Sequence, residues 1–133
     1  MKTIFVSIVS LILSSCGNSY SISGFESYVN EFVEYGKTKN KKIETYELSI
    51  GFGKSEEFEE DVIGICYIYE SGDKDIAIKK EYWDKANEIQ KKVLMFHELG
   101  HCLLGLDHDD TFLNPPGRPK SFMNSHVVNW NIA

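Results

Sequence analysis

The amino-acid sequence predicts an α+β fold, in which a small mixed sheet packs on one long helix and an irregular C-terminal part follows. Three observations support this class. Apolar residues recur every three or four positions in two separate segments, as they do in amphipathic helices. Runs of β-branched and aromatic residues lie between these segments. Beyond Gly105, prolines and small polar residues interrupt every regular pattern.

Residues 1–15 are expected to be a secretory signal peptide. They contain one lysine, an apolar run from Ile4 to Leu13 and then small residues, which are the three parts of such a signal. The run has about ten residues, whereas a membrane-spanning helix needs roughly 20. The letters LSSC that end at Cys16 resemble the bacterial lipobox. That resemblance implies a lipoprotein of the bacterial cell envelope, extracytoplasmic and anchored to a membrane by a lipid on Cys16. The alternative is a plain signal peptide with an incidental cysteine.

Length and charge limit the remaining classes. The 133 residues suffice for one domain, so residues 25–133 are expected to form a single domain, and residues 16–24 a lipidated cysteine with a polar tether. Removal of residues 1–15 leaves 13 basic and 20 acidic side chains, a net charge of −7. Because nucleic-acid binding needs a basic face, no nucleic-acid partner is expected. The domain is expected to be a monomer.

The first half of the domain shows one helix and several strands. Apolar positions in residues 25–35 recur at three and four and predict an amphipathic helix, which Gly36 is placed to end. The letters VIGICYIY are the strongest strand signal in the chain. A loop is expected at 56–61 and a turn at 71–74. The expected strands are residues 43–52, 62–69 and 76–78.

A long helix is expected from Asp84, a favourable capping residue, to about Leu104. Two stripes of side chains run along it, and a helix that is apolar on more than one side lies inside a domain rather than on its surface. Gly105 follows the last helical residue and is expected to end the helix. One stripe contains Ile89, Val93, Phe96, Gly100 and Leu103, and the other contains Gln90, Leu94, His97 and His101.

The stretch HELGHCLLGLDH, residues 97–108, holds three of the four histidines. His97 and His101 lie one turn apart and about 40° around the helix axis, so both can reach one metal ion. Zn²⁺ is the usual choice for neutral nitrogen ligands outside the cytoplasm. Glu98 lies about 100° around from His97, where it can act as general base in an H-E-x-x-H motif. His108 supplies the third protein ligand of a catalytic zinc site. An ordinary buried helix would leave the two helical histidines hard to satisfy.

HELGHCLLGLDH followed by the letters SFMN at 121–124 resembles the metzincin clan of zinc metallopeptidases, whose signature is H-E-x-x-H-x-x-G-x-x-H with a downstream methionine turn. The strand at 62–69, the short strand at 76–78 and the long helix also resemble the clan's order of antiparallel edge strand, inner strand and active-site helix. The clear match covers 62–124, about half the chain. The resemblance implies His97, His101 and His108 as Zn²⁺ ligands, Glu98 as general base, Gly105 as the helix-ending glycine and Met123 as the Met-turn methionine.

One departure from the clan's pattern concerns the third ligand. An extra residue between His101 and Gly105 gives H-E-x-x-H-x-x-x-G-x-x-H. Counted from the first histidine, Asp107 occupies the position of the third ligand; counted from the glycine, His108 does. We expect His108, because the turn after the helix aims the ligand. Asp107 and Asp109 are then candidates to orient the imidazoles. The remaining candidates for the ligand position are Asp109 and His126.

Two further comparisons with known zinc peptidases are informative. Ser125 stands where some metzincins place a tyrosine two positions after the methionine, so no residue is assigned to stabilise an oxyanion beside the metal. Another zincin class takes its third ligand from a glutamate on a later helix. Because Glu98 is the last glutamate in the chain, that class is excluded for a site within one monomer.

The resemblance implies hydrolysis of a peptide bond in a peptide or protein substrate. A zinc-activated water would attack the scissile carbonyl, with Glu98 as the base. The strand at 62–69 would form the rim of the cleft, where an extended peptide adds as another strand. The alternative is a non-catalytic zinc-binding or adhesion lipoprotein, which would have no need of an acid at position 98. With Cys16 lipidated, Cys66 and Cys102 either form a disulfide or remain buried thiols.

Overall fold

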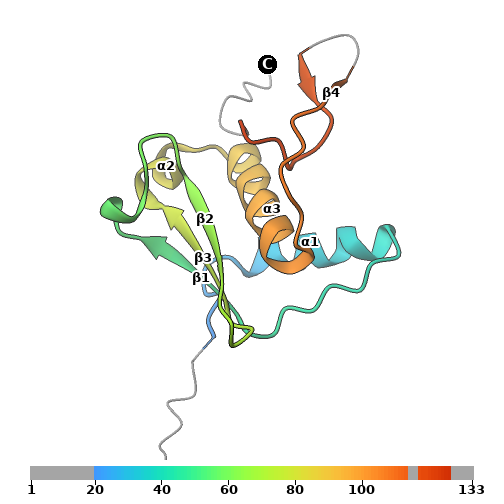
Figure 1. Cartoon of the computed structure of the whole chain (residues 1–133), viewed down its shortest axis with the longest axis horizontal. Coiled ribbons are helices and arrows are strands. Elements are labelled where there is room, and N and C mark those ends of the chain that lie inside the picture. Colours follow the sequence, from blue (N-terminus) through green and yellow to red (C-terminus); the bar gives the residue numbers. More distant parts are fainter. Residues whose placement is uncertain (1–19, 114–116, 127–133) are drawn as a thin grey trace, which may run out of the picture.

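The computed structural model describes residues 20–113 and 117–126. The expected signal peptide (1–15) and Cys16 lie outside the described residues. The small mixed sheet and the helices agree with the expected α+β class (Figure 1). In chain order the elements are α1 (Glu26–Thr38), β1 (Leu48–Gly53), the 3-10 turn η1 (Ser55–Glu57), β2 (Gly64–Ile68), β3 (Lys74–Lys79), α2 (Lys80–Lys85), α3 (Glu88–Leu104), β4 (Phe112–Leu113) and β5 (Arg118–Pro119).

The main sheet has the strand order β1-β3-β2. β1 runs parallel to β3, whereas β2 runs antiparallel to β3 and forms one edge of the sheet. Side chains alternate between the two faces of a strand, so the register places the buried residues of β1 and β3 on one face. These residues are Leu48, Ile50, Ile76 and Ile78.

Helix α3 packs against this buried face, next to β2 and β3, and α1 packs on α3 (Figure 1). The core therefore lies between the sheet and the two helices. Its helical side chains include Val29 and Phe32 from α1 and Leu94, Met95 and Leu99 from α3. Three phenylalanines extend the core toward the C-terminal part: Phe32 lies 5.1 Å from Phe96 and 6.3 Å from Phe122, between ring centroids.

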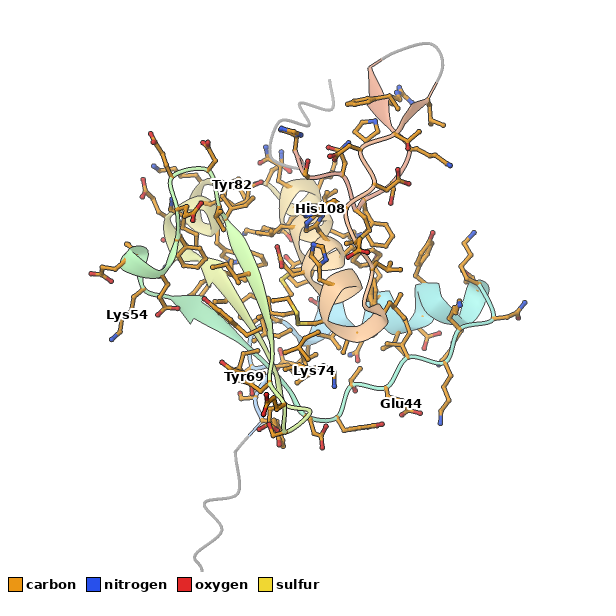
Figure 2. The ribbon with its side chains drawn as sticks, in the orientation of Figure 1. Glu44, Lys54, Tyr69, Lys74, Tyr82 and His108 are labelled. Atoms are coloured by element: carbon orange, nitrogen blue, oxygen red, sulfur yellow. A yellow bond between two sulfur atoms is a disulfide. The ribbon has the colours of Figure 1, made fainter. Side chains whose placement is uncertain are left out.

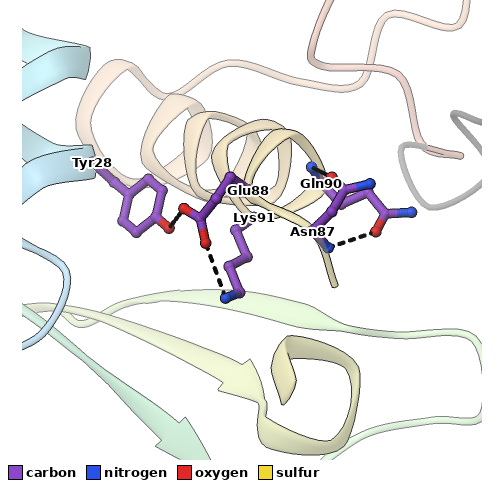
Figure 3. A network of polar contacts seen from close by, with 5 residues as sticks. All are labelled: Tyr28, Asn87, Glu88, Gln90 and Lys91. Atoms are coloured by element: carbon purple, nitrogen blue, oxygen red, sulfur yellow. Dashed lines mark hydrogen bonds and ion pairs between the residues drawn. The ribbon is translucent and has the colours of Figure 1, made fainter. Parts of the chain in front are cut away.

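The expected helix from Asp84 to Leu104 is wrong at its beginning. The chain forms a short α2 and then restarts as α3, because Asn87 caps the new helix (Figure 3). The Asn87 side chain accepts a hydrogen bond from the Gln90 N–H at 2.9 Å, and the Gln90 side chain accepts one from the Asn87 N–H at 2.9 Å. Such a reciprocal pair satisfies two free donors of the first turn. Asp84 instead pairs with Lys80 inside α2.

The beginning of α3 is also tied to α1. The Tyr28 hydroxyl donates to the Glu88 carboxylate at 2.9 Å, and the Lys91 ammonium lies 3.2 Å from the same carboxylate (Figure 3). These exposed contacts contribute little stability. They fix the first turn of α3 relative to α1, in the same place where Asn87 caps it.

The buried face of α3 agrees only in part with the two stripes that the sequence predicted, because Leu94, His97 and Gly100 are buried but the beginning of the first stripe is not. Ile89 is 53% exposed, and Val93 is only half-buried, because the start of α3 lies outside the core. The sheet also covers the opposite flank, so Met95, Leu99 and Cys102, which lie outside both stripes, are buried as well. The buried residues of α3 are Leu94, Met95, His97, Glu98, Leu99, Gly100 and Cys102.

Two expected boundaries in the first half are wrong. Gly36 does not end the first helix, which continues to Thr38; its missing side chain leaves room for Ile43, which packs against α1 there. The first strand begins at Leu48 rather than at Ile43, because Glu47 has a φ of 62° and interrupts the extended backbone.

The segment at residues 20–24, expected as part of a tether, contacts the sheet. The Ser21 carbonyl accepts a hydrogen bond from the Ile50 N–H at 2.8 Å, and Ile22 packs against the core. Within the described residues, no helix combines the length and apolar character that crossing a membrane requires.

Candidate metal centre

The last turns of α3 and the chain that follows build the site. His97, Glu98 and His101 lie on α3, and Gly105 ends the helix at the position that the sequence predicted. Gly105 has a φ of 60°, a left-handed conformation that glycine adopts without steric cost. Its N–H bonds to the His101 carbonyl at 3.1 Å, and the Leu106 N–H bonds to the Gly100 carbonyl at 3.1 Å. This closure turns the chain back along the helix and returns His108 to the two helical histidines.

The three imidazoles converge through their Nε2 atoms, with His108 beside α3 (Figure 2). The Nε2 of His101 lies 3.1 Å from that of His97 and 3.2 Å from that of His108, and the third separation is 3.2 Å. For two of the rings, the hydrogen bond of Nδ1 shows which nitrogen carries the proton. The Nδ1–H of His97 donates to the Phe122 carbonyl at 2.8 Å, and that of His101 donates to the Leu106 carbonyl at 2.6 Å.

This proton arrangement suits a metal ion. A neutral imidazole with its proton on Nδ1 has only a lone pair on Nε2, so His97 and His101 cannot hydrogen-bond each other at 3.1 Å. A cation among the lone pairs removes their repulsion. Nitrogen atoms about 2.0–2.1 Å from a tetrahedral Zn²⁺ lie roughly 3.3 Å apart, close to the separations in the cluster. Three histidine donors therefore fit zinc.

The candidates for the third ligand separate clearly. Among the described residues, the group able to hold an ion is His97, His101 and His108. Asp107 lines the same cavity but is not part of that group. Asp109 accepts from the Thr111 N–H at 3.1 Å, and His126 lies 3.1 Å from the Ser125 hydroxyl through its Nδ1. The imidazoles of His97 and His101 are oriented by backbone carbonyls, a role that the sequence had offered to Asp107 and Asp109.

Glu98 lies beside the cluster in a cavity of about 520 Å³. Its side chain is 4% exposed, and burial raises the pKa of its carboxyl to about 7. Burial also lowers the pKa of His97 to about 4, which keeps this imidazole neutral and able to bind a metal near neutral pH. The opposite wall of the cavity is the edge strand β2 and the chain just before it, with Val62, Ile65 and Ile68.

Met123 lies beneath the last turns of α3. It is 2% exposed, and a Cβ on Gly100 would lie 2.5 Å from its Sδ. The turn is held by the Ser121 hydroxyl, which accepts from the Met123 N–H at 3.0 Å, and by the Met123 carbonyl, which accepts from the Asp109 N–H at 2.9 Å. Gly100 thus permits the close approach of the turn to the helix.

Three features of the site either were not predicted from the sequence or were left as open alternatives. Cys66 on β2 and Cys102 on α3 form a disulfide, which settles the two alternatives for these thiols. The carbonyls of Phe122 and Leu106 have no sequence signal, because every residue has a carbonyl. Gly64 on β2 lies against Glu98, and only its place in a strongly apolar strand could have indicated a close approach.

A cluster of three histidines and a buried glutamate, in a cleft beside a sheet edge, is the arrangement of a metallopeptidase-like domain. Residues 32–130 match the model of the family described as "Putative phage metallopeptidase". The match covers about three quarters of the chain, and the chain belongs to this family. No curated protein and no solved structure matches the chain significantly.

Proposed function

We propose that the protein is a zinc-dependent metalloendopeptidase that hydrolyses peptide bonds in peptide or protein substrates. The main support is the convergence of three imidazole Nε2 atoms beside the buried carboxyl of Glu98 in an open cavity. A structural zinc site is usually closed by four protein ligands, whereas a catalytic site keeps one position open. Three histidines with an adjacent carboxylate favour the catalytic kind over a zinc-binding or adhesion protein.

The side chains divide the chemistry between them. His97, His101 and His108 would hold the ion. When bound, zinc supplies Lewis acidity and a water of lowered pKa. Glu98 would accept the proton of the attacking water and pass it to the leaving amine. Because burial raises its pKa to about 7, Glu98 can both take up and release a proton near neutral pH.

The substrate would lie along β2. This strand forms an edge of the sheet and one wall of the cavity, so an extended peptide can pair with its free backbone groups. The metzincin-like assignment is part of the same proposal. It is supported by the Gly105 turn, by Met123 beneath α3 and by an antiparallel edge strand that precedes the helix.

The test is cleavage of a peptide library by the purified mature chain, followed by mass spectrometry, with and without a chelator. Cleavage should disappear with the chelator and return with added Zn²⁺. Glu98→Gln should lower kcat on the order of 100-fold or more and leave zinc content near one per chain, because Glu98 is not a ligand. A Glu98→Gln variant that keeps more than about a tenth of the activity would show that another group is the base.

We also propose that the protein is exported and anchored to the membrane by a lipid. Residues 1–15 would be removed and Cys16 would receive the lipid, which places a monomeric catalytic domain on the bacterial envelope outside the cytoplasm. The support is the lipobox-like sequence that ends at Cys16. Cys16→Ser should move the protein from the membrane fraction to the soluble fraction; unchanged partitioning would overturn the lipid anchor.

A further inference from the structure

Gly64, the first residue of β2, lies against the side chain of Glu98. A Cβ built on Gly64 would lie 2.6 Å from Glu98 Oε1 and 2.9 Å from both Cδ and Cγ. Real Cβ atoms essentially never come within 3.0 Å of such neighbours. The Glu98 carboxyl group therefore occupies the volume that any side chain at position 64 would fill.

We propose that Gly64 is a positioning residue for Glu98: its missing side chain creates the place on β2 in which the carboxyl group lies and faces the metal site. The catalytic meaning of this contact rests on the proposed function, whereas the contact itself rests on geometry alone. Gly64 touches neither metal nor substrate in this scheme and would act only through Glu98.

Packing, rather than hydrogen bonding, holds the Glu98 carboxyl group. Burial is the one influence on its pKa, and no hydrogen bond from residues 20–113 or 117–126 reaches it. A carboxyl group without polar anchors takes its position from the atoms that surround it. The backbone at Gly64 is one of these surrounding surfaces, and it lies directly against the Glu98 carboxyl group.

The strand cannot easily move away from the helix to admit a larger residue. Gly64 and Cys66 lie two apart and face the same side of β2, and Glu98 and Cys102 lie one turn apart on α3. The disulfide between Cys66 and Cys102 joins the two elements next to the Gly64–Glu98 contact, with 5.7 Å between the Cα atoms. β2 is also paired with β3, with Gly64 opposite Ile78.

An added methyl group would consequently displace the flexible partner, which is the Glu98 side chain. The fold would tolerate this change, because the atoms that must move belong to one side chain and not to the backbone. The chemistry would not tolerate it, because a misplacement of about 1 Å can cost up to 100-fold in rate.

Gly51 provides the matched control. It is also a strand glycine, on β1, and pairs with Ala77 of β3. A Cβ built on Gly51 would meet no atom within 4 Å. Gly51→Ala therefore makes the same chemical change in the same sheet without contact with the metal site.

The experiment compares wild type, Gly64→Ala and Gly51→Ala as mature zinc-loaded chains, on a peptide found in the library screen. Gly64→Ala should lower kcat roughly 10- to 100-fold, with KM within about threefold, zinc content near one per chain and an unfolding midpoint like that of Gly51→Ala. Gly51→Ala should match wild type in kcat. A wild-type kcat in Gly64→Ala, or a loss no larger than its loss of zinc or of folded protein, would overturn the proposal.

Two further measurements separate this proposal from the proposed function. A wild type that cleaves nothing would refute the peptidase, and a crystal structure of Gly64→Ala would then decide the contact: a displaced Glu98 carboxyl group supports it and an unmoved one refutes it. Should Gly64→Ala fail to fold, the double variant Gly64→Ala/Glu98→Ala becomes the test. Its folding supports the contact, and its failure to fold refutes it.

Discussion

The regions before and after Gly105 are built in different ways. Residues 20–104 form the sheet and the helices around a shared apolar core. In the described part of residues 105–126, the only regular structure is the pair of two-residue strands β4 and β5. Met123 and Asn124 are the only buried residues of that part, and Phe112 is 54% exposed.

The two regions meet at the candidate metal centre and at the ring of Phe122, which packs against Phe32 and Phe96. The second region contributes the Phe122 and Leu106 carbonyls, the His108 imidazole and the Met123 side chain, all at the end of α3. The first region can fold by apolar burial. The second region buries few apolar side chains, chiefly Met123 and the ring of Phe122, so its order depends on these, on the few polar contacts at the site and on the ion they would surround.

The largest expected effect comes from removing His108, the candidate ligand from the second region. His108→Ala should weaken zinc binding on the order of 1,000-fold, about one ligand's share of a typical zinc affinity. Asp107→Ala, next to it in sequence, should change the affinity only a few-fold. Competition with a chromophoric chelator measures both affinities. If Asp107→Ala weakens zinc binding and His108→Ala does not, the third ligand is Asp107, at the spacing counted from His97 rather than from Gly105.

The disulfide tests the first region by itself. Replacing Cys66 and Cys102 with alanine opens a loop with a sequence separation of 36 and should lower the free energy of unfolding by about 3 to 4 kcal/mol. Urea denaturation of the zinc-free double variant measures this loss, with reduced wild type as the control. A change below about 1 kcal/mol would indicate that the core alone fixes β2 against α3.

A somewhat smaller effect is expected from pH in the zinc-free protein. The pKa of Glu98 rises from 4.5 to about 7 on folding, so the folded chain keeps a proton that the unfolded chain has lost. The contribution of Glu98 to the free energy of unfolding should therefore fall as pH rises from 4.5 to 7, by about 3 kcal/mol in total. Glu98→Gln removes this term and keeps the opposing one from His97. The difference between the two unfolding curves should grow across this window; a constant difference would contradict the burial argument.

The smallest effect concerns packing between the regions. Gly100→Ala should push Met123 away from α3, because the new Cβ would lie 2.5 Å from its Sδ. The expected cost is about 1 to 2 kcal/mol of stability. Hydrogen exchange should show faster exchange of amides in residues 105–126, with the amides of β1 and β3 unchanged. Equal changes in both regions would mean that they fold as one cooperative unit.

The approach of His97 to His101 on the helix could be predicted because it depends on local geometry. His97 and His101 share a side of any α-helix at their spacing, and Gly105 ends the helix by its own backbone conformation. The placement of His108 followed from that turn. The start of α3 was locally encoded as well, because Asn87 and Gln90 have the spacing of a reciprocal cap. The prediction had instead taken Asp84 as the capping residue.

The features that could not be predicted depend on which elements face each other in the fold. The resemblance placed the strand of Cys66 beside the long helix but gave no distance between the two thiols, so the disulfide could not be chosen over two free thiols. The same holds for Gly64, whose role appears only when Glu98 lies opposite. The burial of Met95, Leu99 and Cys102 was missed for a related reason, since the position of the sheet, and not the apolar count, decides which flank of α3 is covered.

Phe122 connects the candidate metal centre with α1, a helix that contributes no residue to that centre. Its ring packs edge-on against Phe32 of α1 and Phe96 of α3, and its carbonyl holds the Nδ1–H of His97. A carbonyl cannot move without its own residue, so a change in ring packing reaches the ligand through one peptide group. A residue that lies far from the metal centre can therefore still affect how its imidazoles are oriented. Phe32 lies two contacts away from a ligand, and the aromatic packing around it sets how firmly one imidazole is aimed.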